Sequence, residues 1–411
     1  MLLARLLNAA LTRGALTLVD AQGRSHRVGA GTPTITLRLH DRALHRQLVF
    51  TPRLSFGEAY TDGRLSVEGG SLYDLLAVLS DGVTVDGVAG PLRDRLAPLL
   101  RYIEQNNPLH RARRNVAHHY DLSRQLYELF LDHDLQYSCA YFAEPGTGLD
   151  AAQDAKKRHI AAKLLLHPGH HVLDIGCGWG GMALYLAKHA GVRVTGITLS
   201  KEQLEVARQR AESAGLADRV RFELCDYREV AGRFDRIVSI GMFEHVGVPH
   251  YGAFFDRMHD LLADDGVALL HSIGRSEGPD TTNPWLRKYI FPGGYSPALS
   301  EVVPCIERAG LWTTDVEILR LHYAQTLRLW RERFLARRDE AARLTDERFC
   351  RMWEFYLAGA EIAFRYQGHM VMQIQLTRSA GALPLTRDYM LDTERTLLVA
   401  ENPREQTRAN G

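Results

Sequence analysis

The sequence has few cysteines, and none of them are spaced like a metal site or a disulfide framework. The five cysteines, Cys139, Cys177, Cys225, Cys305 and Cys350, are scattered over 411 residues without a Cys-x-x-Cys pair. This distribution argues against a zinc site and fits a reducing compartment. An excess of one charge is also missing. Because 50 Lys and Arg residues balance 49 Asp and Glu residues, no global field selects nucleic acid.

Long apolar runs are absent as well. No uninterrupted apolar stretch reaches the roughly 20 residues that a membrane-spanning helix needs. The stretch from Met1 to Leu16 is apolar, but Arg5, Asn8 and Arg13 interrupt it, so it predicts an amphipathic helix better than a signal peptide. It has no acidic residue before Asp20, so composition alone leaves a transit peptide open.

The length allows two domains or more, and the pattern divides the chain into four parts. Residues 1–100 predict a small α+β domain, and residues 101–114 a basic linker. The linker contains Arg111, Arg113 and Arg114; it is either a solvated connector or a contact with anionic lipid. Residues 115–400 form the second domain, and residues 401–411 form a polar tail that we expect to be mobile.

The first part shows short apolar segments but no recognisable chemistry. Three segments predict strands: Ala15–Asp20, Thr34–Leu39 and Gln47–Thr51. A turn is expected at Ala59–Arg64, and the spacing of Leu72–Leu79 predicts a helix. We expect this part to pack against the second domain or to position it.

Apolar runs and helical segments alternate from His171 onward. Strands are predicted at His171–Ile175, Val192–Ile197, Val220–Leu224, Arg236–Ile240 and Val267–Ile273. The intervening helices are predicted at Trp179–Ala190, Lys201–Ala214 and Tyr251–Leu262. This alternation predicts right-handed βαβ units, and therefore an α/β fold with a doubly wound, mainly parallel sheet. Ligands of such sheets bind beyond the carboxyl ends of the strands.

A glycine-rich turn follows the first of these strands, at Val172-Leu173-Asp174-Ile175-Gly176-Cys177-Gly178-Trp179-Gly180-Gly181. Its glycines allow a tight turn and close approach of a ligand. Taken alone, the motif is also compatible with a turn that binds nothing. Its Gly-x-Gly-x-Gly spacing differs from the dinucleotide fingerprint, and Thr198 stands where a dehydrogenase would have an acidic residue. Both departures argue against a common dehydrogenase.

Other polar and aromatic residues accompany the turn. Polar or ionisable residues end three later strands, at Cys225-Asp226-Tyr227, Gly241–His245 and His271–Ile273. Aromatic residues are frequent in the loop Trp285–Tyr295 and in the helix Trp353–Tyr366. They also form one face of a helix with Leu327, Trp330 and Phe334. The aromatic stripes predict packing against the sheet or, more specifically, the walls of a lipid tunnel. In the second case, neighbouring arginines such as Arg333 would lie near phosphate groups.

Six strings together resemble a known family. The glycine turn alone is similar to motif I of class I S-adenosylmethionine (SAM)-dependent methyltransferases. The set resembles the cyclopropane-fatty-acyl-phospholipid synthases and the mycolic acid cyclopropane synthases over about residues 115–376, and the N-terminal part resembles that of the phospholipid-acting branch. The strings are Tyr137–Phe142, Val172–Gly181, Gly196–Ser200 with Gln203, Gly241–Gly247, Phe291–Gly294 and Leu321-His322-Tyr323.

The resemblance implies two groups of site residues and no metal. The SAM-binding group is Tyr137, Ser138, Asp174, Gly176, Gly178, Thr198, Gln203, Tyr227 and Arg228. The group that binds bicarbonate is Cys139, Glu244, His271, Ile273 and Tyr323, in which Cys139 and Ile273 contribute main-chain groups. Cys139 therefore need not act as a nucleophile.

The implied reaction is methyl transfer from SAM to the cis double bond of an unsaturated phospholipid chain, followed by closure of a cyclopropane ring. The cation formed on the chain requires a dry cavity, and bound bicarbonate removes the proton that ring closure releases. Because Glu244 and an anion repel each other, either a shared proton or an imidazolium at His271 is required.

The resemblance also implies a cytoplasmic enzyme at the inner face of the membrane. Its partner is the lipid and not nucleic acid, and a homodimer remains open. Three alternatives keep the same fold. They are methylation of the lipid without ring closure, giving a methyl- or methylene-branched chain, methylation of an amine, and lipid binding by a catalytically dead relative.

Overall fold

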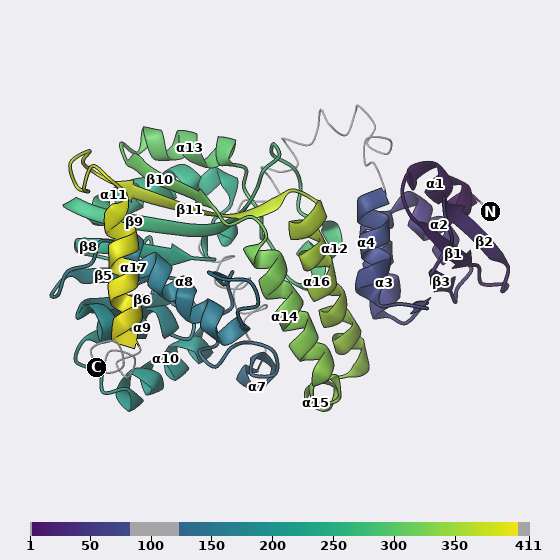
Figure 1. Ribbon diagram of the computed structural model, residues 1–411, viewed down its shortest axis with the longest axis horizontal. Coiled ribbons are helices and arrows are strands. Elements are labelled where there is room, and N and C mark those ends of the chain that lie inside the picture. The colour runs from purple at the N-terminus through teal and green to yellow at the C-terminus, as the bar shows by residue number, and fades with distance from the viewer. Residues whose placement is uncertain (1, 83–122, 402–411) are drawn as a thin grey trace, which may run out of the picture.

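The computed structural model describes residues 2–82 and 123–401, which form a small N-terminal module and a larger α/β part (Figure 1). The expected basic linker, with Arg111, Arg113 and Arg114, and the expected C-terminal tail beyond Glu401 lie outside the described residues. None of the helices in the described ranges combines the length and apolar character that a membrane span requires.

The N-terminal module is a four-stranded sheet covered by helices. The strand order is β2-β1-β3-β4, in which β1 and β3 are parallel and the other neighbours are antiparallel. Leu16, Leu18 and Leu37 form part of its own apolar core. The strands are β1 (Ala15–Val19), β2 (Ser25–Gly29), β3 (Ile35–Leu39) and β4 (Leu65–Glu68). The helices are α1 (Leu2–Ala10), α2 (Leu44–Phe50), α3 (Pro52–Thr61) and α4 (Leu72–Gly82).

One predicted strand of this module is wrong. Residues Gln47–Phe50 belong to helix α2, and Thr51 is its C-cap. Leu44 and Leu48, four residues apart, are buried on one face of the helix, and this helical period decides the structure. The predicted strand matched only the short apolar end of the helix, where Phe50 is 75% exposed.

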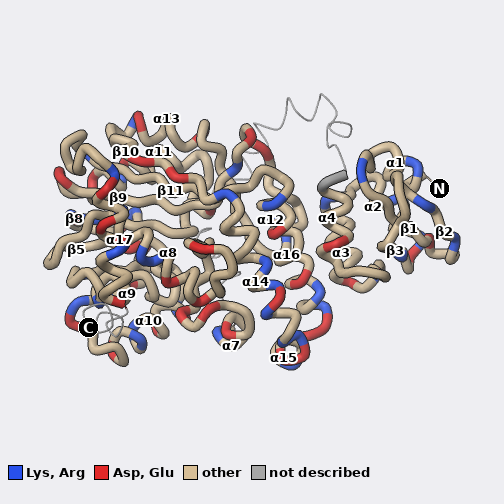
Figure 2. Tube along the Cα trace, in the orientation of Figure 1, with Lys and Arg blue, Asp and Glu red and all other residues tan. Residues whose placement is uncertain are grey.

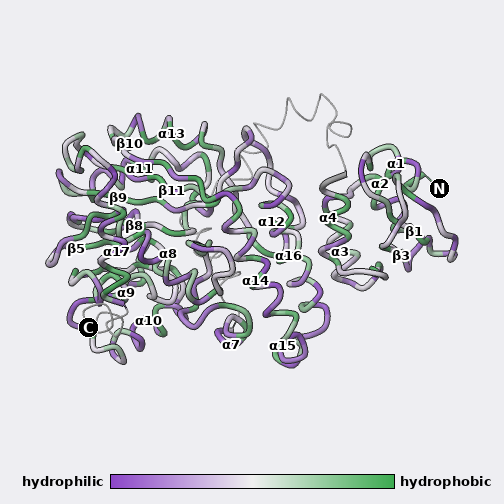
Figure 3. The backbone as a smooth tube through the Cα atoms, viewed as in Figure 1, coloured by the Kyte–Doolittle hydropathy of each residue, from purple (hydrophilic) through white to green (hydrophobic). Residues whose placement is uncertain are grey.

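The larger part is built on a seven-stranded sheet of order β10-β11-β9-β8-β5-β6-β7. Strands β7, β6, β5, β8 and β9 are parallel, whereas β11 pairs antiparallel with both β9 and β10. Figure 3 shows hydrophobic residues along the central strands. The strands are β5 (His171–Ile175), β6 (Arg193–Thr198), β7 (Val220–Leu224), β8 (Phe234–Ile240), β9 (Leu262–Arg275), β10 (Trp312–Ile318) and β11 (His369–Thr377).

Different helices cover the two faces of this sheet (Figure 1). Leu173 of β5 packs toward one face and its neighbour Val172 toward the other, because side chains alternate along a strand. The first face carries α11 (Tyr251–Leu261) and α13 (Leu299–Arg308). The second carries α8 (Leu149–Lys163), α9 (Gly181–Ala190), α10 (Lys201–Ser213) and α17 (Asp388–Glu401). The predicted doubly wound α/β arrangement is therefore present, with an added antiparallel strand.

A third group of helices lies between the sheet and the N-terminal module (Figure 1). Its core is aromatic, and Leu327, Trp330 and Phe334 are all buried in it, as the packing interpretation predicted. The helices are α7 (Arg124–Tyr127), α12 (Pro284–Tyr289), α14 (His322–Ala336), α15 (Arg338–Leu344) and α16 (Glu347–Tyr366).

The arginines of this region have partners within the protein. Arg333 donates to the Leu131 carbonyl oxygen at 2.8 Å and also contacts Asp150. Arg331 pairs with Glu361 at 2.9 Å. Figure 2 shows basic and acidic segments interleaved around α15. These arginines therefore stabilise the packing of the helices.

Candidate functional site

A cavity lies at the carboxyl ends of β5, β6 and β8, where a doubly wound sheet binds its ligands. Its wall also includes the segment Leu135–Ser138, which precedes α8 in the chain. All nine residues expected to contact SAM line this cavity. They are Tyr137, Ser138, Asp174, Gly176, Gly178, Thr198, Gln203, Tyr227 and Arg228.

The glycine turn gives the cavity its floor, and each glycine is required for its own reason. Gly176 and Gly178 have φ values of +82° and +53°, which L side chains rarely adopt. A Cβ on Gly176 would approach Met242 Cβ to 2.9 Å. A Cβ on Gly178 would meet no protein atom within 4 Å, and since Gly178 lines the cavity, it would occupy the space of a ligand.

Asp174 places a buried acceptor at this floor. The residue is 1% exposed, and its Oδ2 atom has no hydrogen-bond partner among the described residues. Burial raises the pKa of Asp174 to about 7, against the opposing effect of Lys156. A buried oxygen without a partner is costly, so this atom suits a ligand that brings a hydrogen-bond donor.

The ends of β6 and β7 complete the cavity with internally bonded residues. Thr198 Oγ1 donates to Gln203 Oε1 at 3.0 Å. Ser200 Oγ caps α10 by accepting from the backbone N–H of Gln203 at 3.3 Å. Arg228 donates to Asp226 through Nε at 2.7 Å and Nη2 at 2.9 Å, and its guanidinium lies 5.3 Å from the centre of the Tyr227 ring.

Glu244 lies beside this cavity on the short 3₁₀ helix η2 (Phe243–His245), whose neighbours Met242 and His245 line the cavity. Glu244 Oε1 accepts from the Ile273 amide at 2.6 Å, and Oε2 has no partner in the part of the chain that the structure describes. Burial raises the pKa of Glu244 to about 7. A buried carboxyl of this kind can hold a proton near neutral pH.

His271 precedes Ile273 by two residues, so both side chains lie on the same face of β9. The Nδ1 atom of His271 lies 3.1 Å from Nε2 of Gln373 on the paired strand β11. Burial is the main reason that the pKa of His271 lies well below its usual value, and the positive charges of Lys156 and Lys163 lower it further. The ring is therefore neutral at pH 7.

Cys139 and Tyr323 are joined to this group by the aromatic core. Both are buried, and Ile273 packs against the same core. The Ala140 amide donates to Thr326 Oγ1 at 3.0 Å, which ties the Cys139 segment to α14, the helix that carries Tyr323. Burial raises the pKa of the Cys139 thiol far above its usual value, so the thiol stays protonated. The structure therefore brings Glu244 to the Ile273 amide of β9, and it places Cys139, in the segment before α8, and Tyr323 of α14 in the aromatic core that Ile273 contacts.

Sequence patterns alone missed several residues of the site. Gln136, Trp179, Asp226 and Met242 line the cavity but were not assigned to the ligand. Asp226 and Met242 lie in two of the strand-end segments that the sequence pattern singles out, but the resemblance gave neither residue a role. The described residues hold no group of three or more His, Cys, Asp or Glu side chains that could bind a metal ion.

Comparisons with known proteins agree on one family. The family described as mycolic acid cyclopropane synthetase matches residues 107–374. A tuberculostearic acid methyltransferase of Mycobacterium tuberculosis is 39% identical over 379 residues, which cover 88% of this chain and 87% of that protein. The cyclopropane-fatty-acyl-phospholipid synthase of Escherichia coli K12 is 42% identical over 260 residues, which cover 63% of this chain and 66% of that protein.

A solved structure gives the same result. A mycolic acid cyclopropane synthase complexed with S-adenosylhomocysteine (SAH) and CTAB aligns with a TM-score of 0.61 and 36% sequence identity. The alignment covers 66% of this chain and 99% of that one.

Proposed function

Because the chain belongs to the mycolic acid cyclopropane synthetase family of SAM-dependent, lipid-modifying methyltransferases, we propose that it cyclopropanates an unsaturated phospholipid. In this proposal, the methyl carbon of SAM is added to a cis double bond of the acyl chain, and bound bicarbonate serves as the base for ring closure. The observation that carries the proposal is the buried Glu244 carboxyl, with one oxygen on the Ile273 amide and the other free for a ligand.

The cavity residues fit SAM. Asp174 Oδ2 is a buried acceptor without a partner, as the ammonium group of an amino acid requires. The absence of a side chain on Gly178 leaves space at the floor. When bound, SAM supplies a methyl group that is electrophilic enough for an alkene to attack. Tyr137, Thr198 and Tyr227 would hold and orient the molecule so that the methyl group faces the acyl chain.

Glu244 would hold the bicarbonate without adding a second negative charge. With a pKa of about 7, it can carry a proton and donate a hydrogen bond to the anion. His271 is neutral and contributes a ring nitrogen without a positive charge. Of the two arrangements that the chemistry allows, these pKa directions favour the proton shared with Glu244 over an imidazolium at His271.

The surrounding core would exclude water. Cys139 and Tyr323 are buried among aromatic side chains, and Trp330 and Phe364 contact the Tyr323 ring at centroid distances of 5.8 and 4.7 Å. A cation on the acyl chain reacts readily with water, so an apolar enclosure favours ring closure over hydration. We place the enzyme at the membrane surface, where its phospholipid lies.

A second outcome, methylation without ring closure, is favoured by one specific observation. The relative with which this chain shares 379 aligned residues is a tuberculostearic acid methyltransferase. A methylene-branched product would use the same cavity and the same transfer step, but a hydride shift would move the cation to the methylated carbon before a methyl proton is lost. A saturated methyl-branched product would in addition require a separate hydride donor to reduce that methylene group.

Expression of the chain in a host with unsaturated phospholipids tests the proposal. Mass analysis of the phospholipid acyl chains should show a gain of one CH₂ together with loss of the double bond. A gain of CH₂ with the double bond retained would indicate the methylene-branched product. Unchanged acyl chains in cells that contain the folded protein would overturn the proposal, and a host without the chain is the control.

A further inference from the structure

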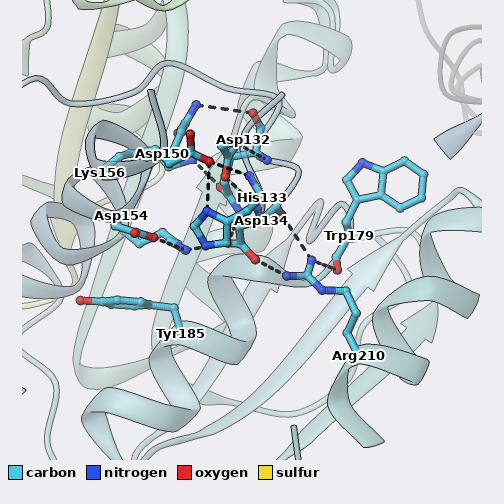
Figure 4. Close-up of polar contacts among 12 residues, drawn as sticks. Asp132, His133, Asp134, Asp150, Asp154, Lys156, Trp179, Tyr185 and Arg210 are labelled. Atoms are coloured by element: carbon cyan, nitrogen blue, oxygen red, sulfur yellow. Dashed lines mark hydrogen bonds and ion pairs between the residues drawn. The ribbon is translucent and has the colours of Figure 1, made fainter. Parts of the chain in front are cut away.

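A fully buried lysine lies behind the wall of the cavity. Lys156 of α8 is 0% exposed, and its ammonium group donates to Ser138 Oγ at 2.9 Å and to the Gln136 side-chain oxygen. Both partners line the cavity. Figure 4 shows Lys156 within a cluster of polar contacts that includes Asp132, Asp134 and Arg210.

The rest of this wall is held firmly in place. Gln153, one helical turn before Lys156, is also 0% exposed, and its Nε2 donates to the Ser138 carbonyl oxygen at 3.0 Å. The Asp132 carboxyl accepts from the backbone N–H of Gln136 at 2.9 Å and from the backbone N–H of Asp134 at 3.0 Å. The position of the Ser138 hydroxyl group is therefore fixed from both its backbone and its side chain.

The buried Asp132 carboxyl is the negative charge that acts most strongly on the pKa of Lys156, but the two groups form no ion pair among the described residues. Asp134 is already paired with Lys157 at 2.6 Å and with Arg210. The Lys156 contacts instead point toward the cavity wall. A buried ammonium group is costly to retain, so contacts with neutral groups at a ligand site call for an explanation beyond charge balance.

The chemistry of the contact restricts Ser138. An ammonium group donates hydrogen bonds and accepts none, so Lys156 can only donate to Ser138 Oγ. The hydroxyl hydrogen of Ser138 must therefore point elsewhere, and Ser138 lines the cavity. Lys156 thus makes Ser138 a donor to the ligand and strengthens that donor by polarising the hydroxyl group.

We infer that Lys156 is a positioning residue for the cofactor, which directs the Ser138 hydroxyl group to the carboxylate of its methionine end. The inference rests on the proposed binding of SAM in this cavity. The cavity would then match both charges of an α-amino acid: the unpartnered Asp174 oxygen suits the ammonium group, and Ser138, backed by Lys156, suits the carboxylate.

Calorimetric titration with two ligands tests this inference. SAM carries the carboxylate, and decarboxylated SAM keeps the sulfonium and the ammonium group but lacks it. The wild type should bind SAM more tightly. Lys156→Met should lower the affinity for SAM by about ten- to a hundred-fold, as expected for a lost charge-assisted interaction, and leave the affinity for decarboxylated SAM nearly unchanged.

A matched variant controls for the loss of a buried lysine. Lys163, seven residues later on α8, is 2% exposed and donates to Gln373 Oε1 at 2.8 Å, away from the cavity. Lys163→Met should reduce stability but keep the ratio of the two affinities. If Lys156 acts through Ser138, the effects of Lys156→Met and Ser138→Ala on SAM binding should not add. Lys156→Gln, which keeps hydrogen bonding but not the charge, replaces Lys156→Met if that variant does not fold.

The outcomes separate this inference from the proposed function. Equal weakening of both ligands by Lys156→Met would mean a structural role only, and would overturn the inference. A wild type that binds SAM and decarboxylated SAM equally would also overturn it, while the proposed function would stand. A folded wild type that binds neither ligand would overturn the proposed function itself.

Discussion

Glu244 accepts the amide hydrogen of Ile273 at 2.6 Å through one oxygen, while its other oxygen has no partner among the described residues. This geometry predicts that Glu244→Met, which cannot donate a hydrogen bond to the anion, weakens the bicarbonate site and leaves SAM binding nearly intact. Loss of one charge-assisted hydrogen bond lowers affinity by about ten- to a hundred-fold, so added bicarbonate should partly restore turnover. Product formation in carbonate-depleted buffer is the measurement. A wild type that runs at full rate without bicarbonate would sink the idea.

Asp174 makes the stability of the ligand-free protein depend on pH. Its pKa is raised by burial to about 7 in the folded protein and is about 4 in the unfolded chain. Between these values the folded state keeps a proton that the unfolded state has lost. The contribution is therefore fully present below about pH 4 and is lost as the pH rises to about 7, by about 1.4 kcal/mol per pH unit.

Asp174→Asn removes this contribution. Denaturant unfolding at several pH values from 4 to 8, without SAM, should give a shallower loss of stability for the variant than for the wild type. The same variant should bind SAM more weakly, because an amide is a poorer partner for an ammonium group. Parallel stability curves would contradict the role given to Asp174.

Gly178 and Gly215 form a matched pair for testing where SAM binds. Both have positive φ values, +53° and +65°, and a Cβ on either would meet no protein atom within 4 Å. Valine at either position therefore introduces similar backbone strain, about 1–2 kcal/mol. Only Gly178 lines the cavity, so Gly178→Val should lower SAM affinity about tenfold or more, and Gly215→Val should not. Wild-type affinity in a normally folded Gly178→Val protein would exclude the placement.

The N-terminal module packs on the methyltransferase part through a contact without room for a side chain. A Cβ on Gly57 of α3 would approach Cδ1 of the Trp285 ring to 2.6 Å. Gly57→Ala should therefore destabilise the protein by about 1–3 kcal/mol. Gly359 of α16 is a helical glycine with no atom within 4 Å of its ideal Cβ, so Gly359→Ala should be neutral or stabilising by about 0.4–1 kcal/mol. Thermal unfolding distinguishes the two, and equal shifts would refute the contact.

The salt dependence of vesicle binding distinguishes two possible modes of membrane contact, one electrostatic and one apolar. The basic cluster Arg111, Arg113 and Arg114 predicts binding to anionic vesicles that weakens with salt, since exposed charges are screened within about 8 Å at physiological ionic strength. Leu2 and Leu6, which lie four residues apart on α1, are 62% and 47% exposed and predict an apolar contact. Co-sedimentation at low and high salt measures both. Replacing the three arginines with Gln should remove the salt-dependent component of vesicle binding. The double substitution Leu2→Ser and Leu6→Ser should remove the component that does not depend on salt.

Much of the α/β part could be predicted because its strands are short apolar runs that end in glycine or polar residues. His171–Ile175 and Val220–Leu224 were predicted to the residue. Strand β2 was missed because only Val28 in it is buried. Strands β10 and β11 were missed because the helical chain between them hides their pairing, which depends on contacts distant in sequence.

The site was predictable where it depends on strand ends and unpredictable where it depends on packing. Gly176 and Tyr227 follow strands and Thr198 ends one, and the topology brings the ends of these strands together. Lys156 lies in the string Asp-Ala-Lys-Lys-Arg-His, which has the composition of an exposed helix. It is buried only because the segment before α8 folds back over it, and no local pattern signals that contact.

The position of strand β11 determines when the large sheet can be completed during synthesis of the chain. This strand is the last among the described residues, yet it lies inside the sheet, with β9 on one side and β10 on the other. The N-terminal sheet is complete once Glu68 has left the ribosome, whereas β9 keeps an open edge from Val267 to Arg275 until Thr377 has emerged. An open strand edge is a template for wrong pairing. Ribosome stalling shortly before His369 should therefore expose the nascent chain to aggregation more than stalling at any point in the first module.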